Sequence, residues 1–169
     1  PPVLLVGPLA LQGEDRVELC FRLARAVSLL GPGRKLAAWR PRRVLKSYVL
    51  AALASASPSI RVPDPEGEVA RIRDDLEGKT DIFAAVKGAV STVRKRFRSL
   101  DLAHWQQAVQ RTSDRIGLLL CTDLTVAGRV LLDLHPDAAN DLVDFALGES
   151  YGELRRSLGL ALGEPKQGT

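Results

Sequence analysis

The side chains that most often carry out chemistry are few and scattered in this chain of 169 residues. The two histidines, His104 and His135, lie far apart in the sequence and lack the spacing of metal ligands. Ser55, Ser57 and Ser59 lie close together, but no histidine accompanies them as a general base. The sequence therefore predicts no metal centre, no cofactor and no nucleophilic active site.

Two separated segments nevertheless carry a recognisable pattern. Residues 18–29 read Glu-Leu-Cys-Phe-Arg-Leu-Ala-Arg-Ala-Val-Ser-Leu. They resemble the active-site helix of HtpX-like and CAAX-prenyl-protease-like zinc metallopeptidases, Glu-Leu-x-x-x-Leu-Ala-His-Glu-Leu-Gly-His. Residues 110–119 resemble the second motif of that family, Glu-x-x-x-Asp-Arg-x-Gly-Leu, and residues 3–9 resemble its strand and turn before the helix. The resemblance covers residues 2–36 and 100–135.

The residues that matter for catalysis in that family are replaced here. Two histidines at positions i and i+4 of a helix bind one zinc ion, and the glutamate between them is the general base. The corresponding positions are Arg25 and Leu29 for the histidines, Ala26 for the general base and Gln110 for the third ligand. The resemblance therefore implies a degenerate, zincin-like core without catalytic activity.

The same resemblance predicts what fills the place of the metal. If the two motif helices pack as they do in the peptidases, Arg25 faces Gln110 and lies near Asp114. We therefore expect Arg25 to bond with Gln110 or to pair with Asp114 in a polar bridge. The alternative is that Arg25 is a surface residue. The positions that match the family scaffold are Leu19, Leu23, Ala24, Asp114, Arg115, Gly117 and Leu118.

Basic side chains are concentrated in the first part of the chain. Residues 1–60 hold nine Lys or Arg and three Asp or Glu, whereas residues 101–169 hold six and ten. Two basic clusters are candidates for contact with an anion or a partner, although no helix-turn-helix, zinc-finger or RNA-binding pattern accompanies them. The clusters consist of Arg40, Arg42, Arg43 and Lys46, and of Arg94, Lys95, Arg96 and Arg98.

Composition and periodicity predict a mainly α multi-helix domain that holds these residues. Aromatic residues make up only 5% of the chain, and apolar positions recur with helical spacing. We expect six to eight helices and a short N-terminal β element at residues 3–6. The helix over 101–121 should bury Leu102, Trp105, Val109, Thr112, Ile116 and Leu119. A proline-rich loop covers 57–67, the single domain spans 1–162, and the tail 163–169 frays.

These features predict a non-catalytic protein-interaction or regulatory domain. Its partner would be another protein or other domains of a larger, multidomain, bacterial-type parent in the cytoplasm, because this chain starts at Pro1 and has no Met. Cys20 and Cys121 are expected to be buried free thiols, and no apolar run is long enough to span a membrane. The alternatives are a module that binds nucleic acid or an acidic membrane surface through the basic N-terminal region, and an enzyme of an unrecognised class.

Overall fold

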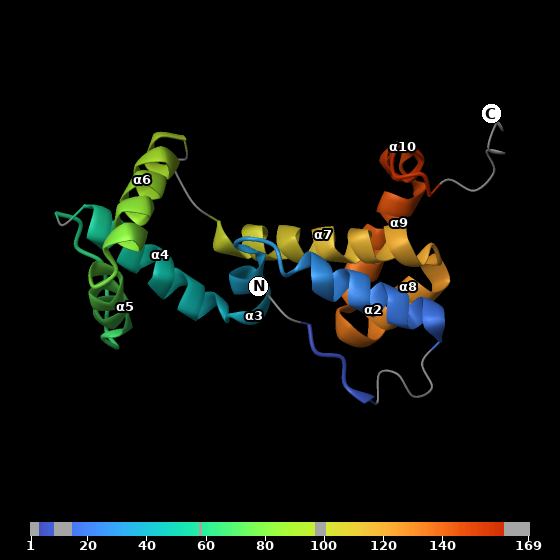
Figure 1. Cartoon of the computed structure of the whole chain (residues 1–169), viewed down its shortest axis with the longest axis horizontal. Helices are drawn as coiled ribbons and strands as arrows, with labels where there is room; N and C mark the ends of the chain where they lie inside the picture. Colours follow the sequence, from blue (N-terminus) through green and yellow to red (C-terminus); the bar gives the residue numbers. More distant parts are fainter. Residues whose placement is uncertain (1–3, 9–14, 58, 97–100, 161–169) are drawn as a thin grey trace. The chain divides into compact units, whose positions relative to one another are not determined.

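The computed structural model describes residues 4–8, 15–57, 59–96 and 101–160. Within these ranges the chain is all-α, with nine helices and no strand (Figure 1). No helix in these ranges combines the length and apolarity needed to cross a bilayer. The helices are α2 (Arg16–Ser28), α3 (Arg34–Trp39), α4 (Arg42–Ala56), α5 (Glu68–Glu77), α6 (Thr80–Arg96), α7 (Leu102–Cys121), α8 (Leu124–Leu134), α9 (Pro136–Leu147) and α10 (Glu149–Ser157).

The predicted N-terminal β element is wrong over residues 4–6, which have no regular secondary structure, and Val3 lies outside the described residues. A strand needs a neighbouring strand to pair its backbone groups, and the described ranges offer none. Leu5 is instead 89% exposed. The helices outnumber the expected six to eight because of α3, a six-residue helix with one buried residue, Ala37. The tail 163–169 lies outside the described residues.

The chain divides into two compact units. The first comprises Pro1–Ala38 and Gln107–Thr169, and the second comprises Trp39–Gln106. In the first unit, α8 packs against α2 and α9, and α9 packs against α10. The core of this unit contains fully buried Phe21, Leu118, Leu131 and Leu142. Four helices thus supply large apolar side chains to one cluster.

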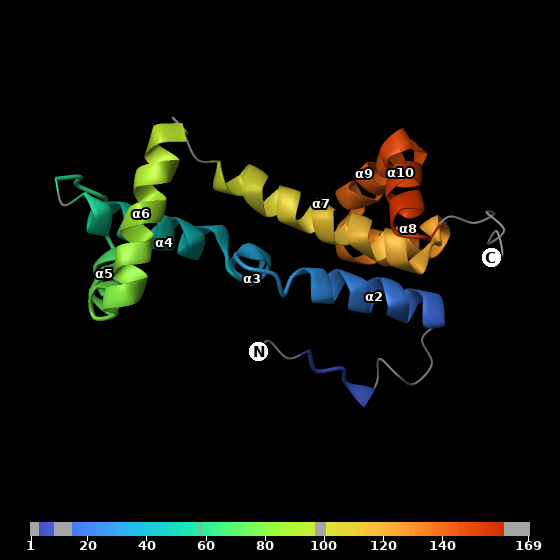
Figure 2. The same cartoon turned by 45° about the horizontal axis from the view of Figure 1, so that its top comes forward.

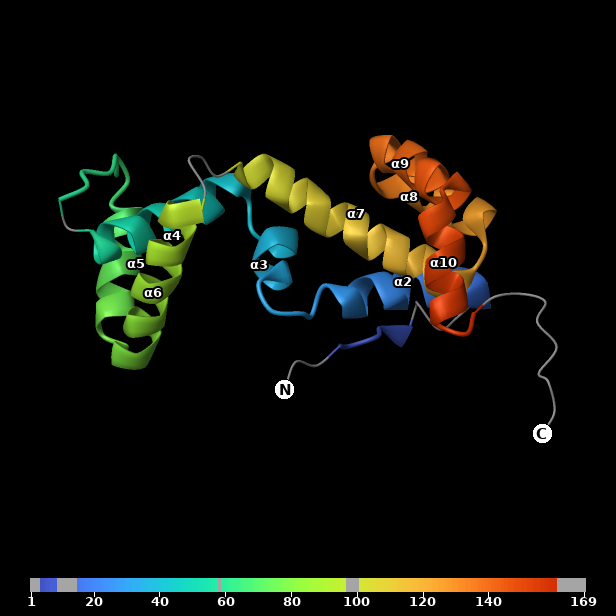
Figure 3. The ribbon, with the colours of Figure 1, turned by 90° about the horizontal axis from the view of Figure 1, so that it is seen from above.

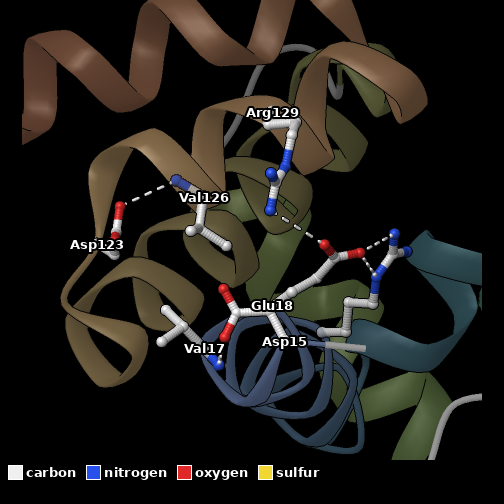
Figure 4. Close-up of polar contacts among 7 residues, drawn as sticks. Asp15, Val17, Glu18, Asp123, Val126 and Arg129 are labelled. Atoms are coloured by element: carbon white, nitrogen blue, oxygen red, sulfur yellow. Dashed lines mark hydrogen bonds and ion pairs between the residues drawn. The ribbon is translucent and has the colours of Figure 1, made fainter. Parts of the chain in front are cut away.

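Capping residues and one bridging carboxylate fix the helix ends of the first unit. Asp15 accepts a hydrogen bond from the Val17 backbone N–H, and Asp123 accepts one from Val126 (Figure 4). Such caps satisfy backbone donors that have no partner within the helix. Glu18 on α2 bonds with Arg22 one turn later and lies 3.4 Å from the Arg129 guanidinium on α8.

The second unit is built from α4, α5 and α6, which pack against one another (Figure 3). Its core cluster is small and consists of Ala51, Val69 and Ile72, with Leu50, Val62 and Leu76 at its edge. The connection over 59–67 contains Asp64, whose two carboxylate oxygens accept hydrogen bonds from Val69 N and Ala70 N at the start of α5. This side chain thereby caps α5 from outside the helix.

Candidate functional site

The candidate site lies where α2 runs beside residues 107–121 of α7 within the first unit (Figure 2). At its centre the Arg25 Nε donates to Asp114 Oδ1 over 2.5 Å. The Arg25 Nη2 also donates to Gln110 Oε1 over 3.0 Å. The polar contact predicted for Arg25 is therefore present, and the surface alternative for this residue is wrong. We call these three residues the arginine bridge.

Packing on either side of the arginine bridge sets the distance between the two helices. One turn before Arg25, the ring of Phe21 lies so close to Gly117 that a Cβ there would come within 2.7 Å of ring atom Cε2. One turn after Arg25, Leu29 packs with Ala37 and Val109. Because residues four apart lie on one helix face, these contacts form a single line along α2. The absence of a side chain at position 117 permits the close approach.

The charged groups of the arginine bridge are largely buried, and burial disfavours an unpaired charge. Asp114 is only 2% exposed, and the Arg25 side chain is 17% exposed. Burial raises the pKa of Asp114 above its ordinary value, while the hydrogen bond from Arg25 and the nearby charge of His135 act in the opposite direction. The negative charge of Asp141 adds to the increase. Desolvation is the largest influence, so Asp114 depends on Arg25 to remain ionised inside the protein.

Only three of the five predicted metal-site positions come together in a polar contact. Arg25, Gln110 and Asp114 meet, whereas Leu29 contributes only apolar contacts. Ala26 has no side-chain group that accepts or donates a proton. A guanidinium carries only hydrogen-bond donors and a fixed positive charge, so this donor set does not fit a cation. No group of three His, Cys, Asp or Glu residues within the described ranges has a metal-binding arrangement.

The first basic cluster lies among carboxylates. Arg43 forms an ion pair with Glu66. With Lys46 it lines a cavity of about 250 Å³ that also contains Asp64, Glu66 and Glu68. Arg40 contributes its backbone carbonyl, which accepts a hydrogen bond from the Gln106 side chain. Arg43 and Lys46 therefore lie beside carboxylates, a setting that does not favour contact with a phosphate backbone.

The second basic cluster is different. Arg94 and Lys95 line a cavity of about 390 Å³ in the second unit. The Arg94 Nη1 donates to Ser57 Oγ over 2.7 Å. Nothing is described of the Arg96 side chain, and Arg98 lies outside the described residues. Lys87 lines the same cavity and was not among the predicted contact residues. It lies two turns before Arg94 on α6, and this helical spacing is the signal that could have found it.

The first unit contains a further charged cluster, formed by Arg111, Arg115 and Asp141, that the sequence analysis did not predict. Arg115 Nη2 donates to both carboxylate oxygens of Asp141, over 3.1 and 3.2 Å. Arg111 lies 3.3 Å from the same carboxylate, and the Arg115 guanidinium lies 5.0 Å from the centre of the Phe145 ring. These contacts join α7 to α9. No local pattern predicts them, because the partners are distant in the sequence.

Comparison with family models, curated proteins and solved structures finds no match to this chain. The resemblance to zinc metallopeptidases therefore stays a prediction, as does the degenerate character of the site. The arginine bridge itself is a property of the structure and does not depend on that resemblance.

Proposed function

We propose that this chain is a non-catalytic protein-interaction or regulatory domain, in which the arginine bridge occupies the position of a former zinc site. The observation that carries the proposal is the pairing of Arg25 with Asp114 and Gln110. A guanidinium held by a carboxylate and an amide supplies internally the positive charge that a bound metal would supply. The helix pair then has a structural role and contributes no reacting group.

Exposed apolar side chains support the protein-binding part of the proposal. Val143 and Leu147 lie one turn apart on α9 and are 41% and 81% exposed. On α10 and its C-cap, Leu154 and Leu158 have the same spacing and are 41% and 57% exposed. Helical rows of exposed apolar residues are typical of surfaces that bind another protein. The partner is a further protein or another domain of the same parent.

Restoring the family's ligands tests the origin of the site. We expect the variant Arg25→His, Leu29→His, Gln110→Glu to bind one zinc ion and to unfold at a higher temperature with zinc than without it. The control carries Val27→His in place of Arg25→His and keeps the other two substitutions. Because Val27 is 54% exposed, a histidine there cannot share a buried ion with position 110. Elemental analysis and thermal unfolding measure the result. Folded protein without zinc, or equal zinc binding by the control, would reject the ancestry.

Quantitative capture tests the interaction surface. We expect a protein that binds to the intact chain to fail to bind the Leu147→Lys variant and to bind the Ile82→Lys variant. Ile82 is the control because it is a comparably apolar residue on α6 that is 51% exposed. The retained protein is then purified and titrated against all three chains. Equal binding by both variants would show that the α9 surface takes no part.

A further inference from the structure

A cavity in the second unit lies outside the arginine bridge. It has a volume of about 390 Å³ and lies between the end of α4 and the C-terminal half of α6. Three cationic side chains line it, Lys87, Arg94 and Lys95, together with the hydroxyl-bearing Ser57 and Ser91. The apolar part of the lining comes from Ala56 and Val90. Among the residues that the structure describes, the lining contains no carboxylate, in contrast to the cavity beside Arg43.

Helical spacing brings these groups to one face. Lys87, Ser91, Arg94 and Lys95 lie at positions i, i+4, i+7 and i+8 of α6, and Ser57 is the C-cap of α4. Residues with this spacing share one side of a helix. The two helices of the same unit therefore present their polar groups to a common space.

Two of the three cations contact neutral groups. The Arg94 guanidinium donates to Ser57 Oγ over 2.7 Å, and the Lys87 Nζ lies 4.2 Å from the centre of the Phe83 ring. Within the described part of the chain, neither these two residues nor Lys95 forms an ion pair with an acid. No described carboxylate therefore balances the positive charge of the cavity, and Arg94 is oriented in advance by Ser57. Such preorganisation lowers the cost of ordering a site when an anion binds.

We propose that this cavity binds a small phosphorylated solute, with a phosphate monoester between the three cations. A guanidinium and two ammonium groups carry three positive charges, which more than balance the two negative charges of a phosphate monoester dianion. The serine hydroxyls donate to its remaining oxygens. Ala56 and Val90 give the organic part of the solute an apolar wall. The volume falls within the range of about 300–1,000 Å³ that is typical of small-molecule sites. This proposal does not depend on the proposed function.

A purely structural role makes a different prediction. Cations near the end of α4 also interact favourably with the partial negative charge of a helix C-terminus. If that were their only role, their removal would lower the stability of the unit, and phosphate would not bind. Ligand binding and stability therefore have to be measured on the same variants.

The test is titration calorimetry on the full chain with inorganic phosphate and with glycerol 3-phosphate, at low and at near-physiological salt. We expect saturable binding of both ligands, and weakening by about tenfold with Lys87→Gln or Arg94→Gln, the loss of one charge-assisted contact. Ser91→Asp should abolish binding, because it places a carboxylate in the cavity without removing a cation. Lys79→Gln is the control. It removes the same charge from the exposed residue that precedes α6, outside the lining, and should change the affinity by less than about twofold.

Several outcomes would overturn the proposal. One is the absence of saturable binding by the folded chain. Another is a loss with Lys79→Gln equal to that with Arg94→Gln, which would reflect net charge alone. Binding to vesicles that contain phosphatidic acid, without binding of soluble glycerol 3-phosphate, would assign the cavity to a lipid surface and reject the soluble ligand. Because Lys87→Gln leaves the Arg94–Ser57 hydrogen bond intact, it keeps the test decisive if Arg94→Gln unfolds the unit.

Discussion

The two compact units achieve their packing by different means. The first unit buries four large side chains completely, Phe21, Leu118, Leu131 and Leu142, and places a charged bridge beside them. The second unit has a small cluster around Ala51, Val69 and Ile72. No described side chain of α6 is buried. Since stability grows with the apolar area removed from water, the first unit should be the more stable of the two.

The difference also concerns how each unit uses charge. In the first unit the ion pair of Arg25 and Asp114 is largely removed from solvent, so that each charge depends on the other. The ion pairs of the second unit, such as Arg73 with Glu77, are exposed and contribute little. The first unit is therefore sensitive to the loss of a single partner. The second should respond to changes in its caps and its small core.

The largest expected effect comes from breaking the arginine bridge. Arg25→Ala leaves Asp114 buried without its charge partner, and we expect the free energy of unfolding to fall by about 3–5 kcal/mol. Arg22→Ala is the control on the same helix, because Arg22 pairs with Glu18 at a more exposed site and should cost less than about 1 kcal/mol. Urea unfolding measures both. Equal losses would show that burial of the bridge has no energetic consequence.

The arginine bridge should also make the stability of the chain depend on pH. Burial raises the pKa of Asp114 above its ordinary value of 3.8, so the folded chain holds this proton more tightly than the unfolded chain. The contribution of Asp114 to the free energy of unfolding therefore falls as the pH rises from that value through the folded pKa. Without Arg25 the pKa rises further. The loss caused by Arg25→Ala should thus be smaller at about pH 4 than at about pH 7, and a loss independent of pH would contradict this account.

The next effect tests the close approach of α2 and α7. Gly117→Ala places a Cβ 2.7 Å from the fully buried Phe21 ring and 3.2 Å from the Phe21 carbonyl oxygen. We expect a loss of about 2–3 kcal/mol, because these contacts are to Phe21, which is fully buried. Gly128→Ala on α8 is the control. Nothing lies within 4 Å of its added Cβ, so it should stabilise the chain by up to about 1 kcal/mol through helix propensity. Thermal unfolding distinguishes the two.

Helix termini were the part of the fold most accessible to sequence reasoning. Asp101 and Asp123 each precede an apolar helical pattern, which is typical of an N-cap, and both accept hydrogen bonds from backbone N–H groups in the first turn of their helices. Pro136 begins α9, a position where its missing N–H group is harmless. These signals are local, since a cap or a proline acts on the adjacent turn. The six-residue α3 gave no such signal, because one buried alanine creates no periodicity.

The buried face of α7 shows where such reasoning fails. Apolar spacing predicted Trp105 and Thr112 on the buried side, whereas both are exposed. Ser113, Asp114 and Gly117 are buried instead. Hydrophobic periodicity places polar residues on the exposed face of a helix. It does not predict that Arg25, which is distant in the sequence, pairs with Asp114. Only the resemblance to a two-helix site suggested that contact. The cavity lined by Lys87, Arg94 and Lys95 likewise depends on the packing of α4 against α6, which no local sequence pattern predicts.

A smaller effect is expected from the core of the second unit. Ile72→Ala removes a buried side chain from the cluster with Ala51 and Val69, and should cost about 2 kcal/mol, the lower end for such a truncation. Because this unit has its own core, hydrogen exchange should increase in α4, α5 and α6 before it increases in α8 and α9. Uniform exchange across both units would show that they unfold together and would contradict the difference in stability between them.

The smallest effect compares one cap from each unit. Asp64→Ala removes two hydrogen bonds at the start of α5, and Asp123→Ala removes one at the start of α8. Each should cost about 1 kcal/mol. The response should nevertheless differ in extent. With a small core to hold it, α5 should lose hydrogen-exchange protection along its length, whereas α8 should lose it only in the first turn because Val130 and Leu131 stay buried. Asp75→Ala, on α5 away from its N-terminus, is the control and should leave the exchange of α5 unchanged. If α8 opened as far as α5, helix capping and not core size would determine local stability in both units.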